Sequence, residues 1–232
     1  MANSNQTLVI SDIHLGSTLS HADAVMDFLK KTPFKRLILL GDIFDGTHLF
    51  RFKKADWQLL NFFQKLTKDG KEVIWIKGNH DVVNGKIIPL LKGVEFVESY
   101  CWTERGETYC AIHGHQFDKM AIKNPSIKKI TSKLHSLFAA YMRHQKTASL
   151  LDKFHTSVRR LSKKISEGAI EYAAKNNINY IFCAHTHIPM SLTVELPNKK
   201  RVSYFNSGSW IQEPFNYISI DENGVRVGEF NK

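Results

Sequence analysis

Short apolar runs rich in β-branched and aromatic residues recur along the chain, separated by polar stretches. Runs of this length and composition predict buried strands. Five of them lie at residues 8–10, 37–40, 73–76, 109–112 and 180–183. Between the first three, apolar residues recur at helical spacing within residues 21–31 and 57–66, which predicts a helix in each place. The chain therefore begins as alternating strands and helices, the pattern of an α/β fold.

The remaining segments are richer in strands than in helices. Weak strand patterns at residues 94–97 and 99–103 are expected to complete the first sheet, after a short helix at 87–91. The C-terminal part alternates at 191–196 and 201–205, and again at 217–220 and 225–230, with turn residues inside each pair. A length of 232 residues with 43% hydrophobic content fits one domain, residues 1–232, with a full core and an insertion.

Each of the five runs is followed by a block of acids, amides or histidines. The blocks are Asp12-Ile13-His14, Gly41-Asp42-Ile43-Phe44-Asp45, Gly78-Asn79-His80-Asp81, His113-Gly114-His115 and His185-Thr186-His187. Five such blocks at strand ends predict that their side chains converge on one cluster of metal ligands. Oxygen and imidazole ligands without thiolates suit manganese, iron, zinc or cobalt rather than calcium.

Several of these side chains have a chemical reason to be of their type. A carboxylate at Asp42 can bridge two cations, and Asn79 can offer an amide oxygen without a further negative charge. The spacing of His185 and His187 puts both imidazoles on the same side of an extended backbone. Asp45 either orients a ligand histidine through its other ring nitrogen or is a solvated loop acid. His115 faces either the site or the solvent.

The order of the blocks, from Asp12 to Ser209, resembles that of the calcineurin-like metallophosphoesterases. The resemblance implies a four-layer α/β/β/α sandwich and two divalent ions, Mn²⁺ first, with Fe, Zn, Co or Mg as alternatives. One ion would be held by Asp12, His14, Asp42 and His187, and the other by Asp42, Asn79, His113 and His185, with Asp42 as the bridge. A metal-bridging hydroxide would hydrolyse a phosphate ester or anhydride. Asn79 and His80 would lie beside the substrate phosphate, and His80, held by Asp81, would stabilise charge or protonate the leaving oxygen.

Positive charge is concentrated in the segment 119–164. It holds twelve Lys and Arg residues against the single acid Asp152, a net charge of +11, whereas the whole chain carries +10. Its apolar residues recur at helical spacing and predict two amphipathic basic helices, at about 127–141 and 151–165. Such helices suit a hairpin packed on the core, a lid over an apolar cleft for an acidic amphiphile at an anionic membrane surface, or a nucleic-acid surface. The scarcity of Arg favours the lid over nucleic acid.

An insertion at this place also resembles that of the UDP-2,3-diacylglucosamine diphosphatases of lipid A synthesis. That resemblance implies hydrolysis of UDP-2,3-diacylglucosamine, or a similar nucleotide-linked or lipid-linked substrate, with the insertion receiving the acyl chains. The chain departs from that family at His80, where the family has arginine, and at Ser209, where it has aspartate. The alternative is a nuclease or nucleotide phosphodiesterase on the same metal core.

The N-terminus and the cysteines bear on location. Residues 1–6 carry no targeting pattern and no run has the length of a membrane span, so we expect a cytoplasmic protein, with or without peripheral attachment to the inner face of the cell membrane. Cys101, Cys110 and Cys183 are odd in number and lack metal-site spacing, which predicts reduced core thiols.

Overall fold

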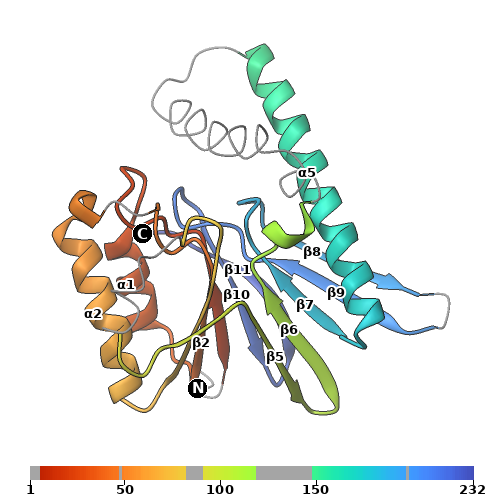
Figure 1. The fold of residues 1–232 in the computed structure, drawn as a ribbon, viewed down its shortest axis with the longest axis horizontal. Coiled ribbons are helices and arrows are strands. Elements are labelled where there is room, and N and C mark those ends of the chain that lie inside the picture. Colours follow the sequence, from red (N-terminus) through yellow and green to blue (C-terminus); the bar gives the residue numbers. More distant parts are fainter. Residues whose placement is uncertain (1–5, 47–48, 82–90, 119–147, 197–198) are drawn as a thin grey trace.

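Two β-sheets form the centre of the fold in the computed structural model, which describes residues 6–46, 49–81, 91–118, 148–196 and 199–232 (Figure 1). The first sheet has the strand order β11-β10-β1-β2-β3-β4. Its strands are β1 (Thr7–Ile10), β2 (Arg36–Leu40), β3 (Glu72–Ile76), β4 (Glu95–Val97), β10 (Phe215–Asp221) and β11 (Gly224–Phe230). Strands β1 to β4 run parallel, while β10 and β11 are antiparallel to their neighbours.

The second sheet has the order β5-β6-β7-β9-β8. Its strands are β5 (Ser99–Glu104), β6 (Glu107–Ile112), β7 (Tyr180–Cys183), β8 (Met190–Glu195) and β9 (Arg201–Asn206). The helices are α1 (Ala22–Lys31), α2 (Lys54–Lys68) and α5 (Ala148–Lys175), with short 3₁₀ helices η1 (Leu49–Arg51) and η3 (His115–Phe117). Strands β6, β7 and β9 are parallel, so their carboxyl ends lie at one edge of the sheet.

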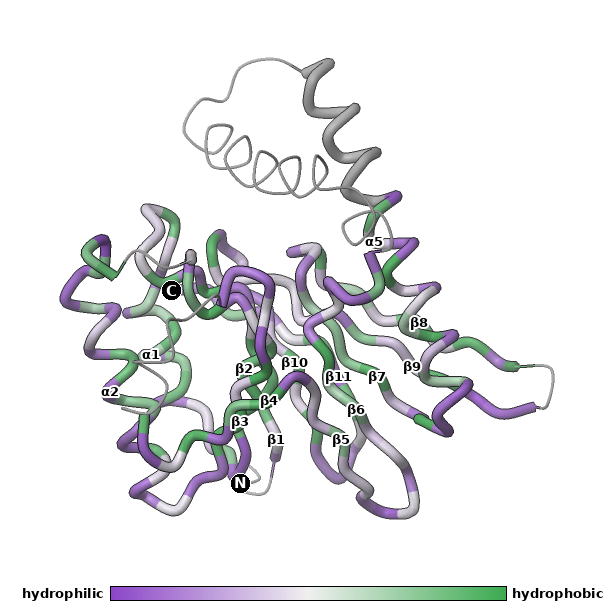
Figure 2. The backbone as a smooth tube through the Cα atoms, in the orientation of Figure 1, coloured by the Kyte–Doolittle hydropathy of each residue, from purple (hydrophilic) through white to green (hydrophobic). Residues whose placement is uncertain are grey.

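The pleat of the strands separates the apolar side chains into layers, because successive residues point to opposite faces. Val9, Ile38 and Ile74 of the first sheet pack with Ala111 and Phe182 of the second, in a core between the sheets. The strands are accordingly the most hydrophobic part of the trace, and the connections at the ends are hydrophilic (Figure 2).

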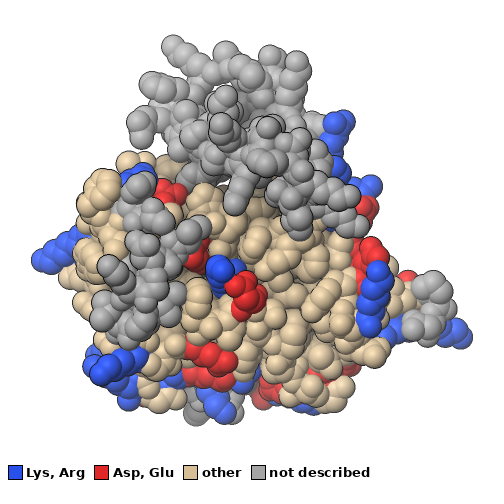
Figure 3. Space-filling view, in the orientation of Figure 1, with Lys and Arg blue, Asp and Glu red and all other residues tan. Residues whose placement is uncertain are grey.

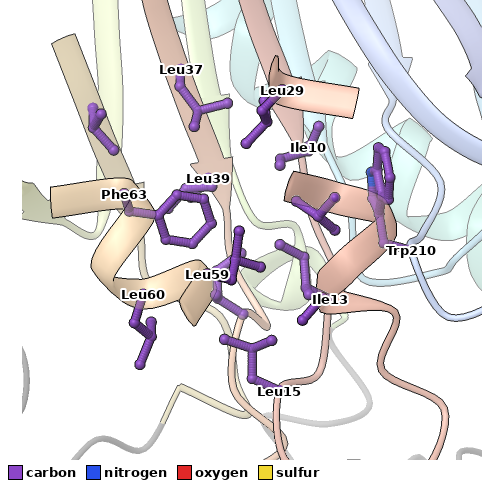
Figure 4. Packing of buried hydrophobic residues seen from close by; sticks show 14 of the residues in the cluster. Ile10, Ile13, Leu15, Leu29, Leu37, Leu39, Leu59, Leu60, Phe63 and Trp210 are labelled. Carbon is purple, nitrogen blue, oxygen red and sulfur yellow. The ribbon is translucent and has the colours of Figure 1, made fainter. Parts of the chain in front are cut away.

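A second apolar layer lies on the outer face of the first sheet. Leu37 and Leu39 of β2 pack there against Leu59 and Phe63 of α2, with Leu29 of α1 beside them (Figure 4). On the outer face of the second sheet, residues of β6, β7 and β9 pack with Ala169 and Ala173 of α5. The fold is therefore the four-layer α/β/β/α sandwich that the sequence predicted.

The prediction for residues 94–103 was wrong in one respect. β4 completes the first sheet, but β5 belongs to the second, where it pairs with β6 from Ser99 opposite Ile112 to Glu104 opposite Glu107. The turn between them, Arg105-Gly106, has positive φ at both residues, which suits the twist of a tight hairpin. β5 therefore pairs with β6, the next strand in the chain, and does not continue the first sheet beside β4.

The same hairpin corrects the prediction for the cysteines. Cys101 and Cys110 lie directly opposite each other in the β5–β6 pair and form a disulfide. Cys183, at the end of β7, is the buried free thiol that the sequence predicted. The pairing depends on strand register, which the cysteine spacing alone does not encode.

The second predicted basic helix is part of the longer helix α5, which continues without interruption to Lys175. The first predicted basic helix and residues 87–90 lie outside the described residues. Lysines and arginines of the described part lie mainly around the edges of the face in Figure 3 and do not form one patch. No helix in the described part of the chain is long and apolar enough to cross a membrane.

Candidate metal centre

The turns that follow β1, β2, β3, β6 and β7 meet at one end of the two sheets. Ligand atoms of Asp12, His14 and His187 lie within 4.8 Å of one another. Those of Asp42, His113 and His185 form a second group with the same limit. These side chains come from the turns after β1, β2, β6 and β7, four separate segments, so the convergence predicted from the strand ends is present in the fold.

The backbone at these positions is unusual. Asp12, His14, Asp42, His185 and His187 all have positive φ, between 50° and 69°. Non-glycine residues adopt this left-handed conformation rarely, and they do so mainly where the surrounding structure enforces it. The strands therefore end in sharp turns that redirect the candidate ligands toward one another.

Two glycines permit the close approach of these turns. Gly41 has φ +83°, and a Cβ atom there would lie 2.3 Å from Nδ1 of His113. A Cβ atom at Gly78 would lie 2.2 Å from both the backbone nitrogen and Oδ1 of Asp42. Both distances are far below van der Waals contact, so glycine is required in the Gly-Asp and Gly-Asn-His blocks.

The surroundings of His113 fit a cation. Its Nδ1 lies 2.7 Å from the carbonyl of Leu40, which makes Nδ1 the donor and leaves Nε2 as an acceptor in the neutral ring. Nε2 faces Oδ2 of Asp42 at 3.3 Å and Oδ1 of Asn79 at 3.2 Å. Three acceptors that converge without a donor need either a proton or a metal ion between them. Without a metal, burial opposes the charged ring, but the Asp42 carboxylate outweighs it and raises the pKa of His113 to about 9.

The other group has the same character. Nε2 of His187 lies 3.0 Å from Oδ1 of Asp12 and 3.4 Å from Nε2 of His14, so two imidazoles and a carboxylate face one point.

His185 belongs to the second group, with Asp42 and His113. Its Nε2 is buried and has no hydrogen-bond partner among the described residues. Burial, reinforced by His113, lowers the pKa of His185 to about 3, which keeps this nitrogen a free electron-pair donor at neutral pH.

Asp42 lies between the two groups. Burial disfavours its charge, but His113 and the other histidines hold its pKa well below the usual range. Burial lowers the pKa of His113 and His14, but the charge of Asp42 raises the pKa of both, after the larger effect of Asp45 at His14. The charge of Asp42 therefore acts on imidazoles of both groups.

Asp45 supports the first group from behind. Its Oδ1 lies 3.5 Å from Nδ1 of His14 and its Oδ2 lies 3.4 Å from a guanidinium nitrogen of Arg51. The side chain is 13% exposed, which fits an orienting carboxylate and not a solvated loop acid. Arg51 was not identified from the sequence, because the segment between Asp45 and α2 contains no recognisable motif.

His80 lies beside the first group, with its ring centroid 5.1 Å from that of His14. Its backbone nitrogen donates to Oδ1 of Asp42 at 2.7 Å, which fixes the start of the side chain. Burial lowers the pKa of His80, so the ring is neutral at neutral pH. The imidazole belongs to neither of the two groups above, but its ligand atom lies within 4.8 Å of those of His14 and Asp45.

Asp81 differs from the prediction that it holds the ring of His80. Its Oδ1 accepts a hydrogen bond from the backbone of Phe44 at 2.9 Å. Its Oδ2 accepts one from the backbone of Gly78 at 2.9 Å and one from Nε1 of Trp75 at 3.2 Å. Asp81 is buried beneath the turns that follow β2 and β3, so its carboxylate ties those turns together.

His115 points toward the histidines. Its ring centroid lies 5.5 Å from that of His113 and 6.3 Å from that of His185. Nδ1 is buried without a hydrogen-bond partner among the described residues, and burial lowers the pKa of His115 to about 4. Of the two orientations that the sequence allowed, the His115 ring therefore has the one that faces the site.

Two face-to-face mixed sheets with paired oxygen and imidazole groups at their strand ends define a metallophosphoesterase. The chain belongs to the calcineurin-like phosphoesterase family, whose model matches residues 6–189. It is therefore a metal-dependent phosphoester hydrolase, and members of this family use divalent ions.

Comparison with individual proteins gives more distant similarities. The chain is 26% identical over 215 residues to a UDP-2,3-diacylglucosamine hydrolase of Yersinia enterocolitica, covering 82% of this chain and 85% of that one. It is 24% identical over 231 residues to the enzyme of the same name from Vibrio cholerae, covering 89% and 91%. Among solved structures, the phosphoesterase Yfce of E. coli is 15% identical with a TM-score of 0.50, covering 95% and 90%, which supports the fold.

Proposed function

We propose that the chain hydrolyses a phosphate anhydride or ester in a nucleotide-linked lipid, with UDP-2,3-diacylglucosamine as the first candidate substrate. The observation that carries the phosphohydrolase part is the convergence of His113 Nε2 on the oxygens of Asp42 and Asn79, which calls for a cation. The substrate part is supported by curated relatives with the name UDP-2,3-diacylglucosamine hydrolase that match along most of the chain.

The proposed ligand sets follow the two groups of side chains. One ion is held by Asp12, His14, Asp42 and His187, and the other by Asp42, Asn79, His113 and His185. When bound, two such ions supply a water-derived nucleophile at neutral pH and a clamp for the phosphoryl oxygens. The oxygen and imidazole set suits Mn²⁺ first.

The protein's own groups then have distinct tasks. Leu40 fixes His113 through its carbonyl, and Asp45 lies against the other nitrogen of His14, so both rings present Nε2 to the site. His80 is neutral and donates one N–H to a phosphoryl or leaving oxygen, where negative charge grows during the reaction. Its backbone bond to Asp42 holds that donor at the edge of the site.

The basic segment 119–164 is proposed to receive the acyl chains and to lie against an anionic membrane surface. The helix α5 packs beside the site just beyond this segment, where Gly168 lies against η3. A Cβ atom at Gly168 would lie 3.2 Å from Cβ of Phe117, two residues after His115. The packing of α5 near His115 supports the proposal that the basic segment, which ends in this helix, lies close to the site.

Hydrolysis of UDP-2,3-diacylglucosamine with added Mn²⁺, compared with bis-p-nitrophenyl phosphate, tests the proposal. Strong preference for the lipid, with UMP and the 1-phosphorylated diacyl sugar as products, is the expected result. Hydrolysis of the diester alone would leave the metal site and remove the proposed substrate, and nucleotides and nucleic acids would be tested next. Binding to anionic liposomes and to DNA at equal salt separates the membrane proposal from the nucleic-acid alternative.

A further inference from the structure

The turn that carries His185 and His187 rests on a buried polar side chain outside every candidate ligand set. We propose that Asn206 is a positioning residue that sets both histidines for metal binding, and that the hydroxyl of Thr186 is its partner. The inference rests on the proposed metal-dependent function. With its two histidines held in this way, one turn can deliver a ligand to each of two ions.

Asn206 ends β9, next to β7 in the second sheet, and pairs with Cys183. The side chain is fully buried, so each of its polar atoms needs a partner within the protein. Its Nδ2 lies 2.8 Å from the carbonyl of Ala184, 3.2 Å from Oγ1 of Thr186 and 3.2 Å from the hydroxyl of Tyr204. The amide group therefore contacts the residue before His185 through its backbone carbonyl and the residue after it through its hydroxyl.

The acceptor side of the same amide is used as well. Oδ1 of Asn206 accepts a hydrogen bond from the backbone of Gly208 at 3.0 Å, which fixes the orientation of the amide group. Gly208 itself has φ +71°, and a Cβ atom there would lie 2.6 Å from Cβ of Asn216, so this turn admits little adjustment. The bond from Gly208 thus fixes the amide group of Asn206, and Nδ2 of the same amide binds the turn that carries His185 and His187.

The histidine turn needs such support. His185 and His187 both have left-handed φ, at 69° and 59°, and such residues persist where surrounding bonds hold them. Within the turn, Thr186 N donates to the carbonyl of Ala184 at 2.8 Å, and Ala184 N donates to the carbonyl of His113 at 2.9 Å. These backbone bonds close the turn, and the side-chain bonds of Asn206 connect the turn to the end of β9.

The residue after Asn206 extends the link to the first sheet. Oγ of Ser207 lies 2.7 Å from Oγ of Ser11, which donates to Oδ2 of Asp12 at 2.5 Å. The second oxygen of Asp12, Oδ1, faces Nε2 of His187 at 3.0 Å. The Asn206-Ser207 pair therefore holds histidines from one sheet and an acid from the other in fixed relation, as two adjacent metal ions require.

The experiment compares Mn²⁺ binding by the wild type with that of Asn206→Ala, measured by titration in the absence of substrate. The expected result is a 10- to 100-fold weaker affinity, about the effect of losing a residue that orients a ligand. Activity should recover when Mn²⁺ is raised to saturation, because no reacting group has been removed. Ser203→Ala, whose hydroxyl bonds Thr193 at 3.0 Å elsewhere on β9, is the matched control and should bind like the wild type.

A second pair of variants keeps the test decisive if Asn206→Ala does not fold. Thr186→Val removes the hydroxyl and keeps the side-chain shape, and it should weaken Mn²⁺ binding, whereas Thr186→Ser should retain it. Equal affinities of the two Thr186 variants, or an Asn206→Ala protein that binds Mn²⁺ like the wild type, would overturn the inference. Failure of the wild type to bind any divalent ion would instead overturn the proposed function.

Discussion

The two sheets supply different side chains to the two halves of the proposed metal centre, and one turn of the second sheet depends on an additional polar side chain. In the first sheet, the strand pairing continues into the turns as backbone hydrogen bonds: Asp12 N to Gly41 O at 3.0 Å, and His14 N to Asp42 O at 3.1 Å. In the second sheet, backbone bonds also continue into the turn of His185 and His187, from Ala184 N to His113 O at 2.9 Å, and the side chain of Asn206 adds contacts to Ala184 and Thr186. The first half contains every proposed oxygen ligand, and the second contains only imidazoles among the proposed ligands.

This difference indicates how each half responds to substitution. Turns built from backbone bonds and close contacts tolerate almost any change in a distant side chain but do not tolerate an added carbon at Gly41 or Gly78. A turn held by an amide and a hydroxyl depends on single polar atoms. Four predictions separate the halves, beginning with the largest effect.

Asp42 belongs to the first half, and its charge acts on imidazoles of both. Asp42→Asn keeps the shape but removes the charge that a bridge between two cations needs. We expect loss of Mn²⁺ binding and a fall in hydrolysis of at least about 10³-fold, beyond the usual cost of one electrostatic partner. Metal content after gel filtration and the rate with bis-p-nitrophenyl phosphate measure both effects. Asp27→Asn, on the exposed surface of α1, is the control, and retention of both ions by Asp42→Asn would refute the bridging role.

His80 sharpens the comparison, because it lies in the first half without being a proposed ligand. In His80→Gln the backbone bond from residue 80 to Asp42 remains, so the metal site keeps its shape. Turnover at saturating metal is expected to fall about 10²-fold or more, as for loss of a positioned proton donor, while the metal content stays at the wild-type value. Loss of metal from this variant would show that the ring supports the ligands and does not act on the substrate.

Gly41 tests whether the first half depends on backbone approach. Gly41 and Gly70 have almost equal φ, +83° and +81°, but a Cβ atom would strike His113 at Gly41 and would meet nothing within 4 Å at Gly70. Gly41→Ala should therefore cost about 1–3 kcal/mol more in the free energy of unfolding than Gly70→Ala, and should also weaken Mn²⁺ binding. Equal losses in urea unfolding would mean that only the positive φ matters.

The smallest effect concerns the charge coupling between the halves in metal-free protein. Asp42 raises the pKa of His113 to about 9 despite burial. Because this value lies above the unfolded value of about 6.5, the stabilisation is complete below pH 6.5 and is lost as the pH rises toward 9. Urea unfolding in EDTA should show a loss on the order of 1–3 kcal/mol across that range. His113→Gln should flatten the slope, and a wild-type stability that is constant with pH would disprove the coupling.

The sequence was most informative where local pattern and chemistry coincide. Each apolar run that predicted a strand before a ligand block is a strand, because a short β-branched run bounded by glycine and polar residues has few other stable conformations. The candidate ligands meet because parallel strands end at a common edge. The direction of the turns follows from left-handed residues such as Asp42 and His185, which no propensity indicates.

What the sequence could not predict depends on pairing between distant segments. β5 and the disulfide follow from the register of the β5–β6 hairpin. Asp81 sits beside His80 in the chain, but its carboxylate is directed to Phe44 and Gly78, so adjacency misled the prediction. The link between Asn206 and Thr186 exists only after β7 and β9 pair, so the sequence did not indicate it.

The left-handed conformation of five candidate ligands affects the heat resistance of the protein; these residues are Asp12, His14, Asp42, His185 and His187. Each holds its peptide units in a conformation that costs on the order of 1–3 kcal/mol, so the centre is a reservoir of strain opposed by three apolar cores. A glycine in place of His187 would relax the turn while abolishing a ligand. With both proteins kept metal-free in EDTA, such a variant should outlast the parent on heating, so that selection for heat resistance in the absence of metal would erode the catalytic apparatus first.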